Sequence, residues 1–439
     1  MARWDRRSPG QQAKFQDAAL ARQVSENLAP FSPYWARVVR PTGIRAEQVT
    51  RVSDLAAVPV LGERDLCPDG DPAGAAQLVL HVTEAGYARH TGGPALRRAL
   101  RRRLTRPAAY ARQVQDAARP VTYHLGGLAV PLPIASTRED LDVIARAGAR
   151  AWAVLGLTAD DLLVSALPPD GALTAMALPY AALGAGAPGV HAGLEAAAEA
   201  LAVMPATVVA VADADALDAL GRLPSTVHTV LVTTDDTDVA ALAEHARVLR
   251  VWGPPDGRWL YAECRQGGRS AGLHTYPDLE VLETVDPASG ESAPSGELVI
   301  TQLGVRGSAL LRWRTGAVHE GLLSGACPSC GRTVPRIGPE VRPGALVEQA
   351  LVEGELVALD LRAAAGALAG RPDITGWRIR VQPEPGTTTS SVVVAISPTG
   401  RPRQAAAAAY ADIQAVAGVG PSQVLIEEGF TDGAIDLTP

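Results

Sequence analysis

The sequence predicts an α/β protein in which a large N-terminal region of doubly wound sheets and a distorted β-barrel precedes a small α+β C-terminal domain. Three observations carry this prediction. Short apolar segments alternate with helical segments from about residue 135 to 253. Hydrophobic residues then recur at every second position between residues 272 and 316, and the pattern changes again after residues 341–344. Alternating strands and helices are typical of a parallel sheet covered on both faces, whereas a period of two is typical of antiparallel strands.

Length and composition limit the classes of protein that fit. The chain has 439 residues, 47% of them hydrophobic and 20% charged, with a formal net charge of −7. That length predicts two or three domains, and the charge gives no support for binding nucleic acid or an acidic membrane surface. No apolar segment follows the charges of the first residues, and the most apolar stretch, 172–193, is broken by Pro179 and Pro188. We therefore expect a cytoplasmic protein that does not enter a membrane.

The first elements are mostly helical. Residues 1–30 predict a polar helix, residues 31–44 a loop that enters a second helix, and LVLHVT, residues 78–83, a strand. Residues 94–119 are again helical, and they contain a cluster of arginines: Arg97, Arg98, Arg101, Arg102, Arg103 and Arg106. Several of these lie four residues apart, which puts their guanidinium groups on one side of a helix. A solvated basic face, a site for an anionic ligand and a surface for an acidic partner all fit this cluster.

The alternating region begins with a capped helix, because Ser136 and Thr137 precede acidic residues in its first turn. Strands are then predicted at 161–168, 206–212, 226–234 and 247–253, with helices at 194–204, 215–223 and 238–246. Antiparallel strands follow at 272–286, 296–303 and 308–316. Beyond VRPG the chain predicts a small unit of strands and two helices. We place the domains at 1–342 and 343–439.

Four residues predict a metal centre. Cys327 and Cys330 form a CxxC knuckle followed by a glycine, and this spacing turns two thiolates toward one ion. Cys264 and His274 lie ten residues apart across a short loop that enters a strand. Together they would complete a Cys3His set, which is typical of a closed structural zinc site.

Two other interpretations of these cysteines stay open. The CxxC pair could be redox-active, although no strand–CxxC–helix pattern surrounds it. The thiols could also carry no ligand, as we expect for Cys67, which lies far from the others in the sequence.

Several stretches resemble one known family. FSPYWARVVRPTGI, residues 31–44, and VPVLGERDL, residues 58–66, resemble the SPFYRERL…GI and LPFTTKEDL stretches of phenylacetate–CoA ligases. YAEC…GLHTYPDLEVLETVDPASGE…SGELVITQL and LLRWRTGAVHEGL…CPSCGRTVPRIG resemble their EC…GLH…GELV.TTL and RYRTGD…CPCGRT.PRIG stretches. The match is dense over residues 252–338. By this resemblance the chain is similar to the phenylacetate–CoA ligase-like members of the adenylate-forming superfamily.

The resemblance implies a fold, a reaction and ligands. Such enzymes combine doubly wound sheets, a distorted barrel and a small mobile C-terminal domain. They join a carboxylic acid to ATP in the presence of magnesium, release pyrophosphate, and let the thiol of CoA attack the acyl-adenylate. Some members bind zinc through an equivalent Cys and His arrangement. We expect an acyl pocket near residues 163–176 and 252–256, and either a homodimer or a partner protein of the same pathway.

The nucleotide-site motifs are only partly present. The family's phosphate loop SSGTTGKP has its best counterpart in YARHTGGP, residues 87–94, which keeps Thr91 and Gly92 but lacks the lysine. The magnesium-binding YGLTE has its counterpart in Trp252-Gly253-Pro254-Pro255-Asp256, where Asp256 is the one acid. A plain turn is the better interpretation of the first stretch and an equally good one of the second.

Two further residues with which the family binds ATP and its substrate are missing from this sequence. The motif RYRTGD keeps Arg314 and Thr315 but ends in Ala317, so the carboxylate that accepts both ribose hydroxyls is missing. The family's C-terminal lysine is missing too, because Lys14 is the only lysine of the chain. A positive charge on the reacting carboxylate is a main source of catalysis in such chemistry. We therefore expect weak or lost adenylation, with two readings: a divergent acyl-CoA ligase, or a catalytically silent homologue that binds an acyl ligand or a partner protein.

Overall fold

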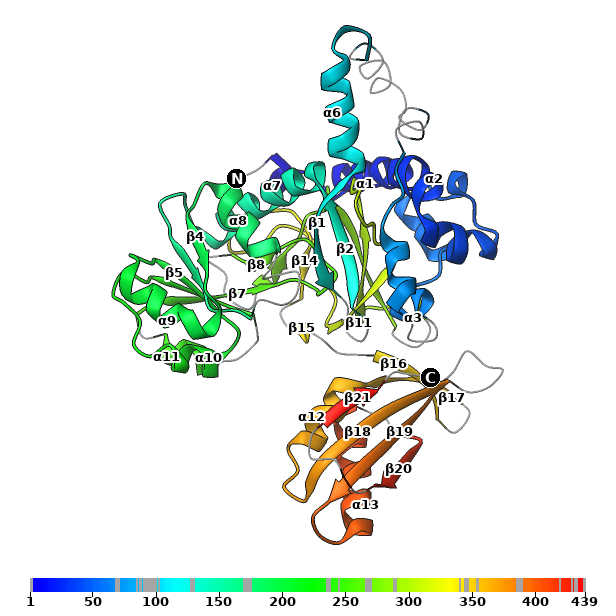
Figure 1. The fold of residues 1–439 in the computed structure, drawn as a ribbon, viewed down its shortest axis with the longest axis vertical. Coiled ribbons are helices and arrows are strands. Elements are labelled where there is room, and N and C mark those ends of the chain that lie inside the picture. The colour runs from blue at the N-terminus through cyan, green and yellow to red at the C-terminus, as the bar shows by residue number, and fades with distance from the viewer. Residues whose placement is uncertain are drawn as a thin grey trace.

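The fold was analysed in a computed structural model of the whole chain (Figure 1). The structure describes residues 3–67, 72–83, 86, 89, 101, 103–126, 131–168, 176–233, 238–243, 245–264, 271–286, 290–338, 341–342, 347–352, 355–383, 390–417, 420–427, 429 and 433–436. Within these residues the chain is a mixed α/β protein, with one large sheet, a smaller antiparallel sheet, a hairpin and a separate C-terminal sheet. Thr91 and Gly92 lie outside the described residues.

The large sheet has nine strands in the order β13-β14-β9-β8-β7-β6-β5-β3-β4. Its parallel half confirms the predicted alternation: β3 (Leu163–Ser165), β4 (Gly189–His191), β5 (Val208–Val211), β6 (Thr229–Val232) and β7 (Arg247–Trp252). Its other half is antiparallel and consists of very short strands: β8 (Tyr261–Glu263), β9 (Leu273–His274), β13 (Leu322–Leu323) and β14 (Arg336–Ile337). The sheet is therefore mixed, not a purely parallel one.

Helices cover both faces of the parallel half, as predicted (Figure 1). On one face, α7 (Arg138–Leu155) and α8 (Leu178–Ala185) pack against Leu163, Val208 and Leu231. On the other, α9 (Gly193–Val203), α10 (Ala214–Ala219) and α11 (Asp238–Leu242) pack against Val164 and Val209. Successive strand residues point to opposite faces, so each strand feeds two hydrophobic cores.

A second group of strands stands where the barrel was expected. The hairpin of β1 (Pro120–Gly126) and β2 (Leu132–Thr137) is one sheet. The antiparallel strands β10 (Glu280–Val285), β11 (Gly296–Gln302), β12 (Trp313–His319) and β15 (Val341–Arg342) form another. The hydrogen-bonded path of the described strands does not close, so the predicted distorted barrel is not shown. The period of two in this region does correspond to antiparallel pairing.

The N-terminal elements differ from the expected single helix. Helix α1 (Pro9–Arg22) begins at a capping box on Ser8, and a π-helical stretch η2 (Gln23–Leu28) and the short α2 (Ala29–Phe31) follow it. Between these and the hairpin lie the short segments η3 (Trp35–Val39), η4 (Arg40–Thr42), η5 (Ala46–Gln48), η6 (Val52–Ala57), α3 (Glu63–Leu66) and η7 (Pro72–Leu78) and the longer helix α6 (Pro107–Ala118). Helix α6 confirms the second half of the helix expected at 94–119. Residues 90–100 and 102 lie outside the described part.

Two predicted strands differ from the structure: one does not form, and the other begins later than expected. Residues 78–83 form no strand; Val79 makes one isolated bridge to Ser308, and the next two N–H groups donate to different segments. No single neighbouring strand therefore continues the ladder. The strand expected at 308–316 begins only at Trp313, because Arg312 adopts a φ of +46°, which ends regular pairing there.

The residues after 346 form a separate sheet with its own core. Its strand order is β17-β16-β19-β18-β21, with β20 paired to β19. The elements are β16 (Val347–Val352), β17 (Glu355–Asp360), α12 (Leu361–Ala369), β18 (Ile374–Pro383), β19 (Ser390–Pro398), α13 (Pro402–Ala417), β20 (Gln423–Ile426) and β21 (Gly433–Asp436). Leu361, Ile379, Val394 and Ile413 pack between the helices and this sheet. No helix in the described part of the chain is long and apolar enough to cross a membrane.

Asp140 joins the first helix of the alternating region to the antiparallel sheet. Thr137 is the N-cap of α7, and its backbone N–H donates to Oδ2 of Asp140 at 2.9 Å. The same buried carboxylate accepts the N–H of Arg306 at 2.9 Å and that of Gly307 at 2.8 Å. One side chain thus caps a helix and fastens the loop that precedes β12.

We predict that Asp140→Ala destabilises the protein by about 3 kcal/mol, because hydrogen bonds to a charged group contribute about 1.5–3 kcal/mol each and the buried N–H groups would lose their acceptor. Urea unfolding at neutral pH measures the change. Asp142→Ala on the exposed side of α7 is the matched control and should shift stability by less than about 0.5 kcal/mol. Equal losses in the two variants would contradict this role of Asp140.

Candidate functional site

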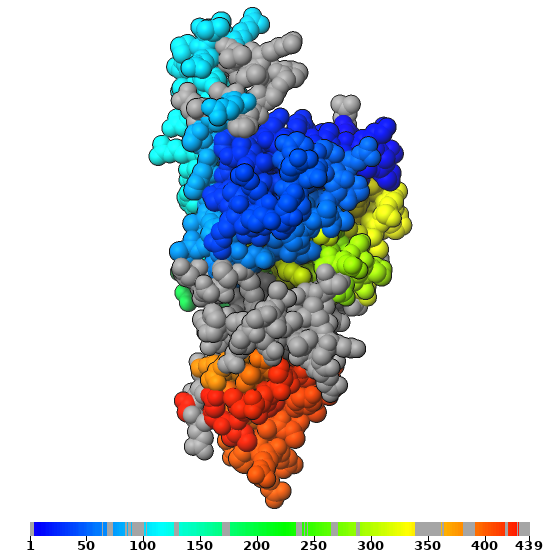
Figure 2. Space-filling view, turned by 90° about the vertical axis from the view of Figure 1, so that its right-hand side faces the viewer, coloured from blue at the N-terminus to red at the C-terminus, as the bar shows by residue number. Residues whose placement is uncertain are grey.

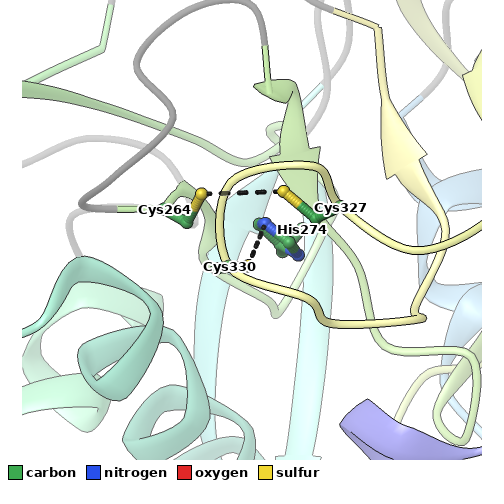
Figure 3. A group of neighbouring side chains, drawn as sticks. All are labelled: Cys264, His274, Cys327 and Cys330. Carbon is green, nitrogen blue, oxygen red and sulfur yellow. Dashed lines mark hydrogen bonds between the residues drawn. The ribbon is translucent and has the colours of Figure 1, made fainter.

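Short antiparallel strands bring the four predicted metal ligands together (Figure 3). Cys264 directly follows β8, and His274 ends β9. His274 lies opposite Ala262 on β8 and opposite Arg336 on β14. Cys327 and Cys330 lie on the loop that enters β14. The pairing of three neighbouring strands therefore converts ligands that are distant in sequence into one cluster.

The knuckle has the backbone geometry that its sequence predicts. The N–H of Cys327 donates to the carbonyl of Arg332 at 2.7 Å, and the N–H of Gly331 donates to the carbonyl of Cys327 at 2.9 Å. Gly331 adopts a φ of +72°, in the left-handed region that a residue with a Cβ rarely adopts. The glycine after CxxC thus closes a tight turn that points both thiols the same way.

The distances fit a tetrahedral ion. The sulfurs of Cys264 and Cys327 lie 3.8 Å apart, and the sulfur of Cys330 lies 3.6 Å from Nε2 of His274. All four donor atoms lie within 4.8 Å of one another. Around zinc, with Zn–S near 2.3 Å and Zn–N near 2.0–2.1 Å, tetrahedral angles put donor atoms about 3.6–3.8 Å apart. The cluster could therefore bind a metal such as zinc.

The electrostatics of the cluster also favour a cation. Burial, with the neighbouring Cys330 and Cys327, raises the pKa of the Cys264 thiol to about 12. Burial also raises the pKa of Cys327, but the N–H groups of Cys330 and Ser329 outweigh it and hold that pKa below its usual value. Burial, and then Arg332 and Arg336, lower the pKa of His274 to about 3, so its imidazole is a neutral ligand. A divalent ion would offset the repulsion between thiolates that share one buried site.

The alternatives to a metal centre can now be weighed against this geometry. The chain around the knuckle, residues 326–335, contains no helix, so the pattern of a redox-active CxxC at a helix start is not present. All four cysteines are free thiols, and Cys67 lies elsewhere in the hydrophobic core. Four protein donors fill a tetrahedral ion completely, which is typical of a structural site and not of a catalytic one.

The loop that carries the knuckle is fastened to the N-terminus. The N–H of Thr333 donates to the carbonyl of Asp5 at 2.9 Å, and its hydroxyl donates to the carbonyl of Arg7 at 2.7 Å. Nε2 of Gln12 donates to the carbonyl of Thr333 at 3.2 Å. The buried Arg332 pairs with the carboxylate of Asp5 at 3.3 Å. The loop that carries two of the candidate metal ligands thus anchors α1 to the large sheet.

The predicted nucleotide residues at the end of β7 are buried and engaged. Trp252 stacks on Tyr261 with 5.7 Å between ring centroids, and Gly253 follows it. Asp256 is only 3% exposed, and its Oδ2 accepts the indole N–H of Trp313 at 2.7 Å. This contact brings the 252–256 stretch beside β12. It also gives the carboxylate a partner inside the protein.

The motif residues on β12 also have internal partners. Arg314 forms an ion pair with the buried carboxylate of Glu297. The hydroxyl of Thr315 donates to the carbonyl of Leu298 at 2.7 Å and accepts the N–H of Ala317 at 3.2 Å. Ala317 itself is completely buried. These side-chain contacts join β12 to β11 where their register shifts, and they assign no ligand to β12.

Two features beside this region were not predicted. Gly126, at the end of β1, lies so close to Asp256 that a Cβ there would be 2.6 Å from its Oδ1. Glu280 is fully buried, and its carboxylate accepts the hydroxyl of Tyr261 at 2.5 Å and the N–H of Tyr276 at 3.2 Å. Burial raises the pKa of Glu280 to about 8, against the lowering by these two hydrogen bonds. The sequence offered one signal for Glu280, namely an acidic residue within the predicted strand 272–286.

Comparisons with known proteins agree with this fold. No protein-family model matches the chain, and no curated protein matches it. A crystal structure of 2-hydroxyisobutyryl-CoA ligase in an open conformation with 2-HIB-AMP and CoA has 17% identity, covers 97% of this chain and 92% of its own, and has a TM-score of 0.59. The same ligase in the thioesterification state has 16% identity, coverages of 99% and 91%, and a TM-score of 0.60. In the postadenylation state with 2-HIB-AMP the values are 17%, 99%, 88% and 0.59. The chain therefore has the fold of adenylate-forming ligases.

We predict that the purified protein carries about one zinc ion per chain and that Cys330→Ser loses it, because three donors no longer fill the tetrahedral site. Elemental analysis measures the metal, and the melting temperature should fall in the same variant. Cys67→Ser is the control and should keep the metal. A Cys330→Ser variant with unchanged zinc and melting temperature would show that the site is not a structural metal centre.

We predict that Glu280→Gln becomes favourable relative to the wild type as pH rises. The pKa of Glu280 is raised from 4.5 to about 8, so the wild type loses stability between these values, where the unfolded chain ionises and the folded one stays protonated. Glutamine removes that loss, which is on the order of a few kcal/mol. Unfolding free energies at pH 5 and pH 8 measure it, with Glu199→Gln on the exposed side of α9 as control. A difference that is the same at both pH values would contradict the assignment.

Proposed function

We propose that this chain is a phenylacetate–CoA ligase-like homologue in which adenylation is weak or lost, and that it binds an acyl ligand or a partner protein within a biosynthetic pathway. The fold supports the relationship to adenylate-forming ligases. The buried Cys3His cluster supports a structural zinc of the kind that the sequence resemblance implies. The proposed loss of adenylation is argued from the residues that stand at the counterparts of the family's nucleotide-binding motifs.

The observation that carries this proposal is the environment of residue 317. Ala317 stands where the family motif has the aspartate that accepts the ribose hydroxyls, and it is completely buried. Two missing charge-assisted hydrogen bonds would cost about 3 kcal/mol or more, which is roughly a hundredfold in affinity. Glu297, which accepts the N–H of the neighbouring Gly316, pairs with Arg314, and Asp256 accepts the indole N–H of Trp313. No acidic side chain of this motif region is thus available for the ribose.

The phosphate side of the site supports the same conclusion. HLGGLAVP, residues 124–131, shares with SSGTTGKP a glycine and a proline five positions apart, at Gly126 and Pro131. Gly126 lies directly against Asp256, in the counterpart of the family's magnesium-binding stretch. We therefore favour 124–131 over 87–94 as the counterpart of the phosphate loop. This stretch has no hydroxyl and no lysine, so it lacks the side-chain donors with which the family motif adds to the backbone N–H groups that bind phosphate oxygens.

The reacting carboxylate would also lack its positive charge. The proposed C-terminal domain, residues 343–439, contains no lysine, and its last 36 residues, 404–439, contain no arginine. A preorganised cation at the position where charge develops is the largest contribution to catalysis in such a reaction. Without it, the N-terminal domain, residues 1–342, would hold ligands without activating them.

A cavity of about 760 Å³ supports binding of a small ligand. It opens at the carboxyl ends of β3, β4 and β5, where neighbouring strands β3 and β5 lead the chain in opposite directions across the sheet. Open α/β sheets bind ligands at such a crevice. Its wall is mostly apolar, with Leu167 and Leu194 among the lining residues, but Glu195, Asp213 and Asp215 also line it. These acids favour an acyl ligand without negative charge over a free carboxylic acid, an adenylate or CoA. A cytoplasmic location and a homodimer stay predictions.

Titration calorimetry with ATP and magnesium tests the proposal directly. We predict no heat of binding at millimolar ATP and no exchange of labelled pyrophosphate into ATP with phenylacetate or 2-hydroxyisobutyrate, because the ribose and phosphate contacts are missing. Zinc content and a cooperative unfolding transition show that the same sample is folded.

Micromolar ATP binding, or exchange above background, would contradict the loss of activity. Asp256→Asn then locates that activity, since this carboxylate is the one candidate ligand for magnesium in the motif. Asp160→Asn, an exposed acid outside the region, is the control. Exchange that only Asp256→Asn abolishes would establish an active ligase.

A further inference from the structure

Helix α6 projects from the body of the protein (Figure 1). In the space-filling view of Figure 2 the same cyan segment stands above the blue N-terminal elements. The described residues from 101 to 126 contain one acid, Asp116, against five arginines: Arg101, Arg103, Arg106, Arg112 and Arg119. All five are exposed. A chain with a net charge of −7 thus carries a local excess of positive charge on one projection.

These charges are not neutralised within the described part of the protein. Asp116 pairs with Arg138 at 3.8 Å, and the guanidinium of Arg103 lies 5.9 Å from the ring centre of Tyr110. None of the five arginines forms an ion pair with another described residue. The inner side of α6 is accounted for by packing, because Tyr110, Val114 and Ala117 are buried together. The outer side presents Arg112 and Gln115 to solvent.

An apolar row continues from the basic helix along β1. Val121, Tyr123 and Leu125 are 51%, 56% and 63% exposed, whereas His124 between them is buried. Side chains alternate along a strand, so these three lie on one face. Strand β1 pairs only with β2 among the described strands, so no described strand occupies its other edge. Exposed apolar rows on an open strand edge are a feature that monomeric proteins usually avoid.

We propose that this surface, the basic projection, docks an acidic surface of another protein. We define the basic projection as Arg103, Arg106, Arg112 and Arg119 together with the row Val121, Tyr123 and Leu125. Arginine and tyrosine are enriched at protein interfaces, where apolar anchors are surrounded by charged groups. The open edge of β1 adds backbone groups to which a strand of the partner can pair. The positive charge selects a partner with negative charge.

Other occupants fit the surface less well. Two copies packed symmetrically through the basic projection would place one positively charged surface against another. A nucleic acid duplex or an anionic membrane is extended and would also face the acidic remainder of the chain. CoA would need guanidinium groups that converge in a pocket, whereas these arginines lie on a projection (Figure 1). The proposal does not depend on the loss of adenylation, because docking needs no nucleotide.

The experiment identifies the partner and then measures its affinity. A photo-crosslinking phenylalanine analogue replaces Tyr123 in the full-length chain, and irradiation in an extract of the native cells captures what lies on the row. The captured protein is identified by mass spectrometry, purified and used as the binding probe. We expect a protein of negative net charge whose Kd rises about tenfold or more with the triple reversal R103E/R106E/R112E, since each change opposes an interfacial charge.

The matched control reverses three exposed arginines elsewhere, R51E/R401E/R403E, and should change the Kd by less than about twofold. Acid-to-arginine changes on the partner should restore binding to R103E/R106E/R112E. Crosslinks only between copies of this chain, no crosslinked protein, or equal effects of the two triple variants would overturn the proposal. So would binding of a DNA duplex, phosphatidylserine vesicles or CoA that R103E/R106E/R112E abolishes while no protein shows this dependence.

Discussion

The register of β9 is the constraint on which the candidate metal centre depends. His274 faces Ala262 on one side and Arg336 on the other, so β8 and β14 are fixed relative to each other across a strand of two residues. Cys264 follows the first neighbour and the knuckle precedes the second. A shift by one residue would turn the imidazole to the other face and leave three thiols without their fourth donor. A strand of two residues holds this register weakly by itself, so a bound ion and the strand pairing would stabilise each other.

Sequence alone predicted those parts whose signals are local. Thr137 and the acids after it identified the start of α7, and the CxxC spacing with its glycine identified half of the metal cluster. It failed where distant residues decide the structure. Residues 78–83 look like a strand, but no continuous neighbour pairs with them. The hydrogen bond between Asp256 and Trp313 and the close approach of Gly126 depend on chain segments more than fifty residues apart, which no spacing encodes.

The scaffold and the nucleotide site have different requirements, and this chain meets them unequally. Hydrophobic cores on both faces of the sheet, helix caps and a Cys3His cluster are all retained. In the motif region that would face ATP, polar side chains bond instead to the protein: Arg314 to Glu297, and Thr315 to the carbonyl of Leu298. Such contacts stabilise the folded chain, and they occupy side chains that would otherwise be available to a ligand. A fold of this kind can support binding whether or not it catalyses a reaction, because the pockets and surfaces belong to the scaffold.

Helix α1 and the following η2 depend on partners that are synthesised more than 250 residues later. Gln12 reaches the carbonyl of Thr333, Gln16 that of Glu280 and Gln23 that of Val305, with sequence separations of 321, 264 and 282 residues. During synthesis the first thirty residues therefore emerge without the surface that holds them. Contacts of such separation slow folding and leave apolar positions such as Leu20 and Val24 open to aggregation meanwhile. Expression at low temperature or with a holding chaperone should thus matter more for this chain than its content of regular structure suggests.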